Sequence, residues 1–206
     1  MAAPLPVRPS PIGLAVLGLL CGGPLHPYGI QRLLKEWGKD QVVNVGQRSS
    51  LYKAIGRLEE SGLVAVRQTE RHDQYPERTV YEITGDGRRV VTGWLTDMLS
   101  TPRHEFPTFP AALSFAMLLG PDGVRSALAR RSESLEGVAA ALRTTLLRYS
   151  PELPRITLIE TEYQLAVTEA ELRWLHGVVN ELADGAFTWS ASDFAGAAGA
   201  CTAGGD

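Results

Sequence analysis

The sequence predicts a mainly α-helical protein with one small β-hairpin, divided into an N-terminal and a C-terminal domain. Apolar residues recur at helical spacing over most of the chain, two β-branched segments interrupt that pattern, and prolines cluster where the composition changes near residues 102–110. The predicted organisation is an extended tail over 1–11, a first domain over 12–100, a helical domain over 107–184 and a flexible tail over 185–206.

The first domain begins with three predicted helices. Ile12 to Cys21 is apolar around most of three turns, which is typical of a helix buried on several sides. The second helix runs from Tyr28 to Trp37 and is amphipathic. Ser49 or Ser50 can cap the third helix, which ends at Gly62.

A hairpin and a fourth helix complete this domain. Leu63 to Gln68 and Thr79 to Thr84 are rich in β-branched and apolar residues and are predicted as two strands. A long, charged turn from Thr69 to Arg78 is expected to join them. The fourth helix follows at once, with Thr84 or Asp86 as its cap.

The second domain is predicted to contain one short and two long helices. The short helix spans Leu113 to Leu119, and the first long helix carries apolar residues seven apart. The last helix has two apolar stripes, of which the preceding helix can cover only one, so a second copy of the chain is expected to cover the other. The candidate interface residues of this symmetric dimer are Leu128, Leu135, Leu142, Ile159 and Tyr163.

The order helix, helix, helix, hairpin, helix is that of a winged helix-turn-helix domain, in which the third helix enters the major groove of DNA. The net charge of −3 does not by itself indicate a nucleic-acid partner. Residues 1–100 hold 12 basic and 10 acidic residues, against 8 and 13 in the remainder. The basic excess therefore lies in the N-terminal domain and is modest.

Several motifs in the first domain resemble the PadR family of transcriptional regulators. They are Leu17-Gly18-Leu19-Leu20, Pro24-Leu25-His26-Pro27-Tyr28, Ser50-Leu51-Tyr52, Arg57-Leu58-Glu59-Glu60-Ser61-Gly62-Leu63-Val64 and Tyr81-Glu82-Ile83-Thr84-Gly85-Asp86-Gly87. The resemblance covers residues 12–99 and implies a homodimeric regulator, expected to be a repressor, that binds an inverted-repeat operator. Two positions depart from the family pattern: Pro27 stands where glycine is usual, and Lys53 stands where proline often follows the Leu-Tyr pair.

The candidate DNA-contacting residues lie on and before the third helix and in the hairpin. Their hydroxyl groups and cations suit phosphates and base edges. They are Arg48, Ser49, Ser50, Tyr52, Lys53, Arg57, Arg71 and Arg78. A purely structural interpretation stays open, in which a serine caps the helix, Tyr52 packs against the second helix, Arg57 pairs with Glu60 and the hairpin arginines are surface charge.

Aromatic residues near the domain junction and in the second domain are candidates for an effector pocket, since some PadR relatives look like sensors of small aromatic or lipophilic compounds. These residues are Trp94, Phe109, Tyr163 and Trp174, and core packing is the competing explanation for each. A ligand in a hydrophobic pocket at the dimer interface can bias the relative placement of the two recognition helices.

Other classes of protein fit the sequence less well. No nucleophile elbow, Walker loop or metalloprotease motif is present, so an enzyme is not expected, and the scattered histidines predict no metal or other cofactor. The longest apolar run is about half the roughly 20 residues that a membrane span needs, and two distant cysteines, Cys21 and Cys201, fit a reducing cytoplasm. The remaining alternative is a winged helix that binds protein rather than DNA.

Overall fold

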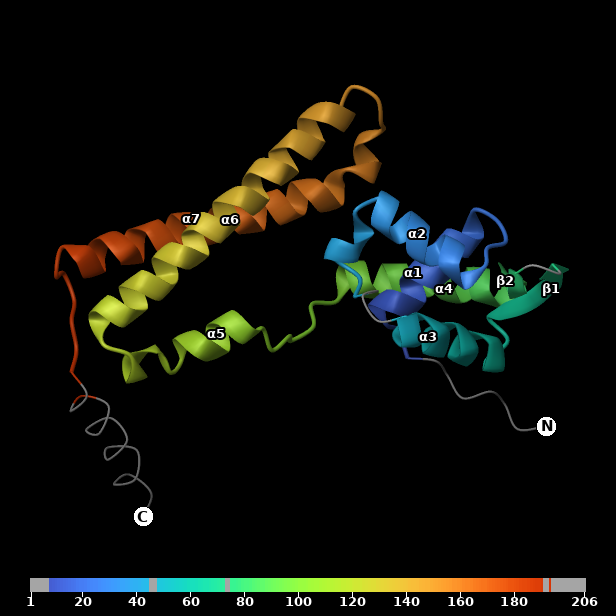
Figure 1. Ribbon diagram of the computed structural model, residues 1–206, viewed down its shortest axis with the longest axis horizontal. Helices are drawn as coiled ribbons and strands as arrows, with labels where there is room; N and C mark the ends of the chain where they lie inside the picture. Colours follow the sequence, from blue (N-terminus) through green and yellow to red (C-terminus); the bar gives the residue numbers. More distant parts are fainter. Residues whose placement is uncertain (1–7, 45–47, 73–74, 191–192, 194–206) are drawn as a thin grey trace, which may run out of the picture. The chain divides into compact units, whose positions relative to one another are not determined.

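The structure is a computed structural model that describes residues 8–44, 48–72, 75–190 and 193, without the side chains of Gln41, Arg48, 69–72 and 75–78. The chain divides into two units, one ending at His104 and the other beginning at Glu105 (Figure 1). We call them unit 1 and unit 2. The mainly helical class with one hairpin is confirmed, and no helix of the described residues is long and apolar enough to cross a membrane.

Unit 1 opens with the helices α1 (Pro11–Cys21), α2 (Pro27–Glu36) and α3 (Arg48–Glu60), with a short 3₁₀ turn, η1 (Lys39–Gln41), after α2. Prolines occupy the first positions of α1 and α2, where their missing N–H costs nothing. Ser10 Oγ accepts from Gly13 N at 3.2 Å, and His26 Nδ1 accepts from Gly29 N at 2.7 Å. Pro27, one of the departures from the family pattern, is the first residue of α2, directly after the capping residue His26. Proline is well suited to that position, which explains its presence.

The wing consists of β1 (Val64–His72) and β2 (Tyr75–Ile83), paired antiparallel. The expected long turn from Thr69 to Arg78 is wrong, because the pairing continues outward to His72 and Tyr75. The outer part of the hairpin does not alternate apolar and polar residues, because neither face of a two-stranded ribbon needs to be buried there. The pattern that indicates strands is therefore missing from the sequence. Helix α4 (Gly85–Ser100) follows, and its cap is Thr84, whose Oγ1 accepts from Gly87 N at 3.0 Å.

The core of unit 1 surrounds α1, which packs against α3 and α4. Its members come from all four helices and the start of the wing, and each is at most 8% exposed. They are Val16, Leu17, Leu20, Ile30, Leu34, Leu51, Ile55, Leu58, Leu63, Val64, Val91 and Trp94. The buried side of α3 packs into this core, so the opposite side of the helix faces outward.

Unit 2 contains α5 (Thr108–Leu113), the 3₁₀ turn η2 (Ala116–Leu118), the long helix α6 (Pro121–Tyr149), the turn η3 (Arg155–Thr157) and the long helix α7 (Ile159–Ala183). The long helices lie side by side (Figure 1). The single short helix expected over Leu113 to Leu119 is wrong, because the chain forms α5 earlier and then only one turn. Pro110 lies within α5, whose first turn needs no N–H at that position.

Apolar contacts and ion pairs join α6 to α7. Leu128 and Leu175 lie in the buried cluster of the unit. Arg131 pairs with Glu171 at 2.5 Å and Arg143 with Glu169 at 2.7 Å. The helical hairpin of unit 2 is thus held along its length within one chain.

The segment after α7 is docked on unit 2 as far as it is described. Trp189 Nε1 donates to the carbonyl oxygens of Leu119 at 2.8 Å and Met117 at 3.2 Å, and its ring packs on the apolar cluster. The flexible tail expected over 185–206 therefore does not begin at residue 185. Most of it, like residues 1–7 of the expected N-terminal tail, lies outside the described residues.

Candidate DNA-binding surface

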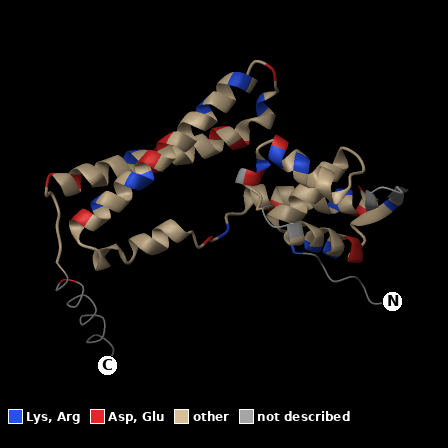
Figure 2. Ribbon diagram, viewed as in Figure 1, with Lys and Arg blue, Asp and Glu red and all other residues tan. Residues whose placement is uncertain are grey.

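The outward side of α3 carries most of the predicted DNA-contacting residues. Leu51, Ile55 and Leu58 are buried on one side of the helix. Because an α-helix turns 100° per residue, the opposite side is centred on Ser49, Lys53, Gly56 and Glu60. Figure 2 shows basic residues along α3 and acidic residues at its C-terminal end.

The structure tests the purely structural interpretation for several of these residues, whereas DNA contact itself stays a prediction. Ser49 and Ser50 lie inside α3, which begins at Arg48, so the expectation that one of them caps the helix is wrong. Tyr52 is 56% exposed rather than buried against α2. No ion pair between Arg57 and Glu60 occurs among the described residues, and Lys53 and Arg57 are both exposed. The side chain of Arg48 lies outside the described part.

The two flanks of α3 face different neighbours. Tyr52 and Glu59 lie on the flank toward Tyr81 of β2. Burial raises the pKa of the Tyr81 phenol, and the nearby Glu59 carboxylate and Tyr52 phenol raise it further. Ser50 and Arg57 lie on the other flank, which lines a groove beside the start of α1. The helix therefore presents an edge with an aromatic ring and a carboxylate on one side, and a cationic edge on the other.

The wing places its two candidate arginines on the outer part of the hairpin. Arg78 pairs in register with Glu70, and Arg71 lies at an irregularity of the register between Glu70 and His72. The side chains of Arg71 and Arg78 lie outside the described part. Their role in DNA contact therefore stays a prediction from the sequence.

The proposed effector-pocket residues fall into separate places. Trp94 is 8% exposed and belongs to the core of unit 1, with its ring 3.2 Å from the position a Cβ on Gly13 would take. In unit 2 the rings of Phe109 and Trp174 meet edge to face, with centroids 6.2 Å apart. Arg131 lies over the Phe109 ring at 3.7 Å. The structure thus brings together two of the four residues and adds Arg131, which the sequence did not indicate.

Tyr163, the fourth residue of that set, is 70% exposed on α7 and also belongs to the predicted dimer interface. Ile159, one turn before it, is 45% exposed. Leu128 is buried in the chain's own core, with Leu135 packed against it. The seven-residue seam of α6 is thus used largely within one chain, whereas the Ile159 and Tyr163 side of α7 faces outward.

Sequence reasoning missed Arg8, which was assigned to an extended tail but lines the groove beside α3. The signal was the pair Ser10-Pro11, since a serine followed by proline is a typical helix start. Arg8 precedes the capping residue Ser10 by two positions, so it is held close to the start of α1.

The fold and the outward helix define a winged helix-turn-helix transcriptional regulator, a class that binds DNA and is not an enzyme. Residues 16–92 match the transcriptional regulator PadR-like family, so unit 1 carries a PadR-like domain. A comparison with curated protein sequences gave no match.

Three solved structures illustrate the similarity of the fold. Bacillus subtilis PadR in complex with operator DNA is 20% identical with a TM-score of 0.68, covering 83% of this chain and 98% of that chain. The same protein in complex with p-coumaric acid is 17% identical with a TM-score of 0.63, covering 85% and 98%. The Vibrio cholerae virulence activator AphA is 19% identical with a TM-score of 0.61, covering 84% and 98%.

Proposed function

We propose that this regulator binds an inverted-repeat operator as a homodimer, with one α3 in the major groove of each half-site. The observation that carries the proposal is the outward side of α3. It presents hydroxyl groups and cations from Ser49, Tyr52, Lys53 and Arg57, while its apolar side is fixed in the core. A rigid helix with a polar, cationic outer side is what major-groove recognition requires.

The dimer is supported by the exposed apolar side of α7. Ile159, Tyr163, Val167 and Trp174 are between 45% and 70% exposed and follow one another at helical spacing. A large aliphatic and aromatic stripe of this kind is costly in water and typical of a surface that another chain covers. An isologous interface here would pair two copies through the same helix.

Repression, and its release by a small aromatic effector, form the finer part of the proposal. A relative of this fold binds p-coumaric acid, and in this chain Phe109 and Trp174 lie together beside Arg131. An aromatic pair next to a guanidinium suits an aromatic carboxylate. Trp94 is too deeply buried to be the first contact of such a ligand. A regulator of this kind acts where the DNA lies, so the proposal includes a cytoplasmic location.

Selection of bound sequences from a random duplex library, at two salt concentrations, tests the proposal. Enrichment of a palindrome, with affinity that falls as salt rises, is the expected result. Failure to enrich any sequence at either salt would contradict DNA recognition and favour a winged helix that docks to protein. Adding p-coumarate to the enriched complex tests the effector, with release of DNA expected and unchanged binding contradicting that part.

A further inference from the structure

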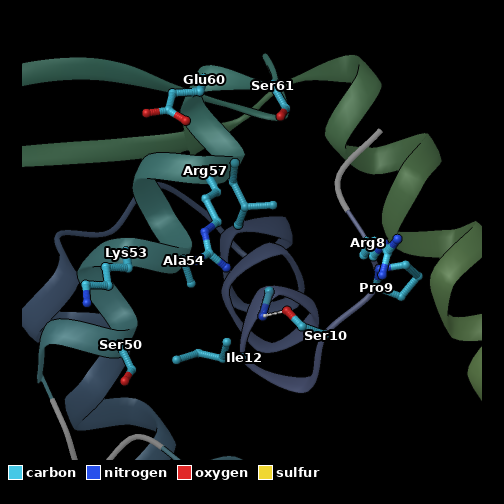
Figure 3. A pocket seen from close by; sticks show the side chains of 12 residues that line it. Arg8, Pro9, Ser10, Ile12, Ser50, Lys53, Ala54, Arg57, Glu60 and Ser61 are labelled. Carbon is cyan, nitrogen blue, oxygen red and sulfur yellow. Dashed lines mark hydrogen bonds between the residues drawn. The ribbon is translucent and has the colours of Figure 1, made fainter. Parts of the chain in front are cut away.

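A groove of about 590 Å³ lies between the flank of α3 that carries Ser50 and Arg57 and the short segment Arg8–Ser10 that leads into α1. Figure 3 shows Arg57 reaching toward it from α3, with Ser50 on the same helix and Arg8 beyond the start of α1. Lys53 lines it as well. Two segments separated by some forty residues thus build one surface beside the recognition helix.

The charge of the groove is strongly one-sided. Its lining residues include three cations, Arg8, Lys53 and Arg57, and one carboxylate, Glu60. Among the described residues none of these three cations forms an ion pair. Elsewhere in unit 1, Arg32 pairs with Glu36. Uncompensated cations gathered in a hollow attract an anion.

The segment that carries Arg8 is held in place. Ser10 caps α1 through its side chain, and its carbonyl oxygen accepts from Leu14 N at 2.8 Å. Pro9 and Pro11 on either side of Ser10 restrict the backbone to few conformations. Arg8 therefore loses less conformational entropy on binding than an arginine in an unanchored terminus would.

We propose that this groove binds the sugar-phosphate backbone of the DNA, and that the segment Arg8–Ser10 is part of the DNA interface. The inference rests on the proposed function, since it assumes that α3 lies in a major groove. The two backbones border that groove, so one flank of the helix must face phosphates. The flank with Arg57 and Ser50 is the cationic one, and Arg8 adds a charge from outside the helix-turn-helix. Lys53 also lines the groove, but it is centred on the outward side of α3, so its proposed contact is with base edges and not with the backbone.

The salt dependence of binding distinguishes binding to phosphates from binding to base edges. Arg8→Ala is measured on the selected operator and on a scrambled duplex of the same length, over a series of salt concentrations. The affinity for both duplexes should fall by the same factor, and the slope of log K against log salt should become shallower by about 0.9 for each phosphate that the variant no longer neutralises. Arg57→Ala should behave in the same way.

Arg130→Ala is the matched control, because Arg130 is an exposed arginine of unit 2 that donates to Ser126 Oγ and is no part of the groove. It removes the same charge and should leave the slope unchanged. If the wild-type protein binds the operator but Arg8→Ala keeps its slope, the groove inference fails alone. A changed base preference in Arg8→Ala would also overturn it. If the wild-type protein binds neither duplex, the proposed function fails and the groove inference fails with it.

Discussion

Gly87 lies in the first turn of α4, directly against the backbone that begins the wing. A Cβ added there would overlap the carbonyl oxygen of Leu63 and lie 2.7 Å from Cγ1 of Ile83, whereas ordinary contact begins near 3.4 Å. The Leu63 carbonyl cannot move freely, since it accepts from Thr84 N at 3.1 Å and shares the Thr84 hydroxyl proton with the carbonyl oxygen of Gly62, at 3.1 Å and 2.8 Å respectively. Gly87→Ala must therefore displace the junction between α3, the wing and α4.

The expected cost follows from the size of that displacement. Overpacking of a rigid site costs about 1–3 kcal/mol, and weakening the two hydrogen bonds to Leu63 costs about 1 kcal/mol each. The higher helix propensity of alanine returns at most about 1 kcal/mol. The net loss in the free energy of unfolding is about 3 kcal/mol, which for a domain of this size lowers Tm by roughly 10–20 °C.

Urea unfolding followed by circular dichroism measures this loss, with Gly56→Ala as the matched control. Gly56 is also a helical glycine, but a Cβ there meets no atom within 4 Å. The same substitution should stabilise α3 by up to about 1 kcal/mol. Opposite signs for the two variants are expected. A Gly87→Ala protein as stable as the wild type would refute the close approach of α4 to Leu63.

Three further predictions concern unit 2 and the flank of α3. Trp189→Phe removes the indole N–H bonds to Met117 and Leu119 and should lower the free energy of unfolding by about 1–2 kcal/mol in chemical denaturation, while an unchanged value would show that the segment is not docked. Val167→Glu should leave the helical content unchanged and convert the proposed dimer to monomer in sedimentation, whereas Leu135→Glu should damage the fold of unit 2. A Val167→Glu protein that still sediments as a dimer would exclude the exposed stripe as the interface. Glu59→Gln should lower the pKa of Tyr81 in a spectrophotometric titration, although burial, its main cause, remains, and an unmoved pKa would contradict their proximity. Since the raised pKa reflects a neutral phenol favoured in the folded state, the contribution of Tyr81 to stability should fall as pH rises above the ordinary tyrosine pKa.

The elements of unit 1 could be predicted because each has a local signal. Glycines and prolines mark the ends of α1 and α2, and Thr84 supplies a capping side chain at the start of α4. The outer half of the wing could not be predicted, because a ribbon that packs on nothing carries no pattern of buried residues. In unit 2 the start of α5 could not be predicted from the proline-rich stretch near residues 102–110, although proline is tolerated in the first turn of a helix, as Pro110 is in α5.

The candidate site was predictable only in part. Periodicity identifies which side of a helix is covered but not what covers it, so the seam through Leu128 and Leu135 looked like an interface between chains and is packed within one. For the same reason Trp94 could not be distinguished from a pocket residue until its neighbours were known. The groove beside α3 depends on bringing the segment Arg8–Ser10 to the side of unit 1 where Arg57 lies, an arrangement of the fold that no local pattern encodes.

Selection of DNA sequences repeated with Lys53→Ala tests the central claim, that the outward side of α3 reads the operator. Lys53 is exposed near the middle of that side, and its replacement should leave the fold and the dimer intact. Weaker binding together with relaxed base preference at the same position of each half-site is the expected result. Enriched sequences and affinities identical to those of the wild-type protein would contradict it.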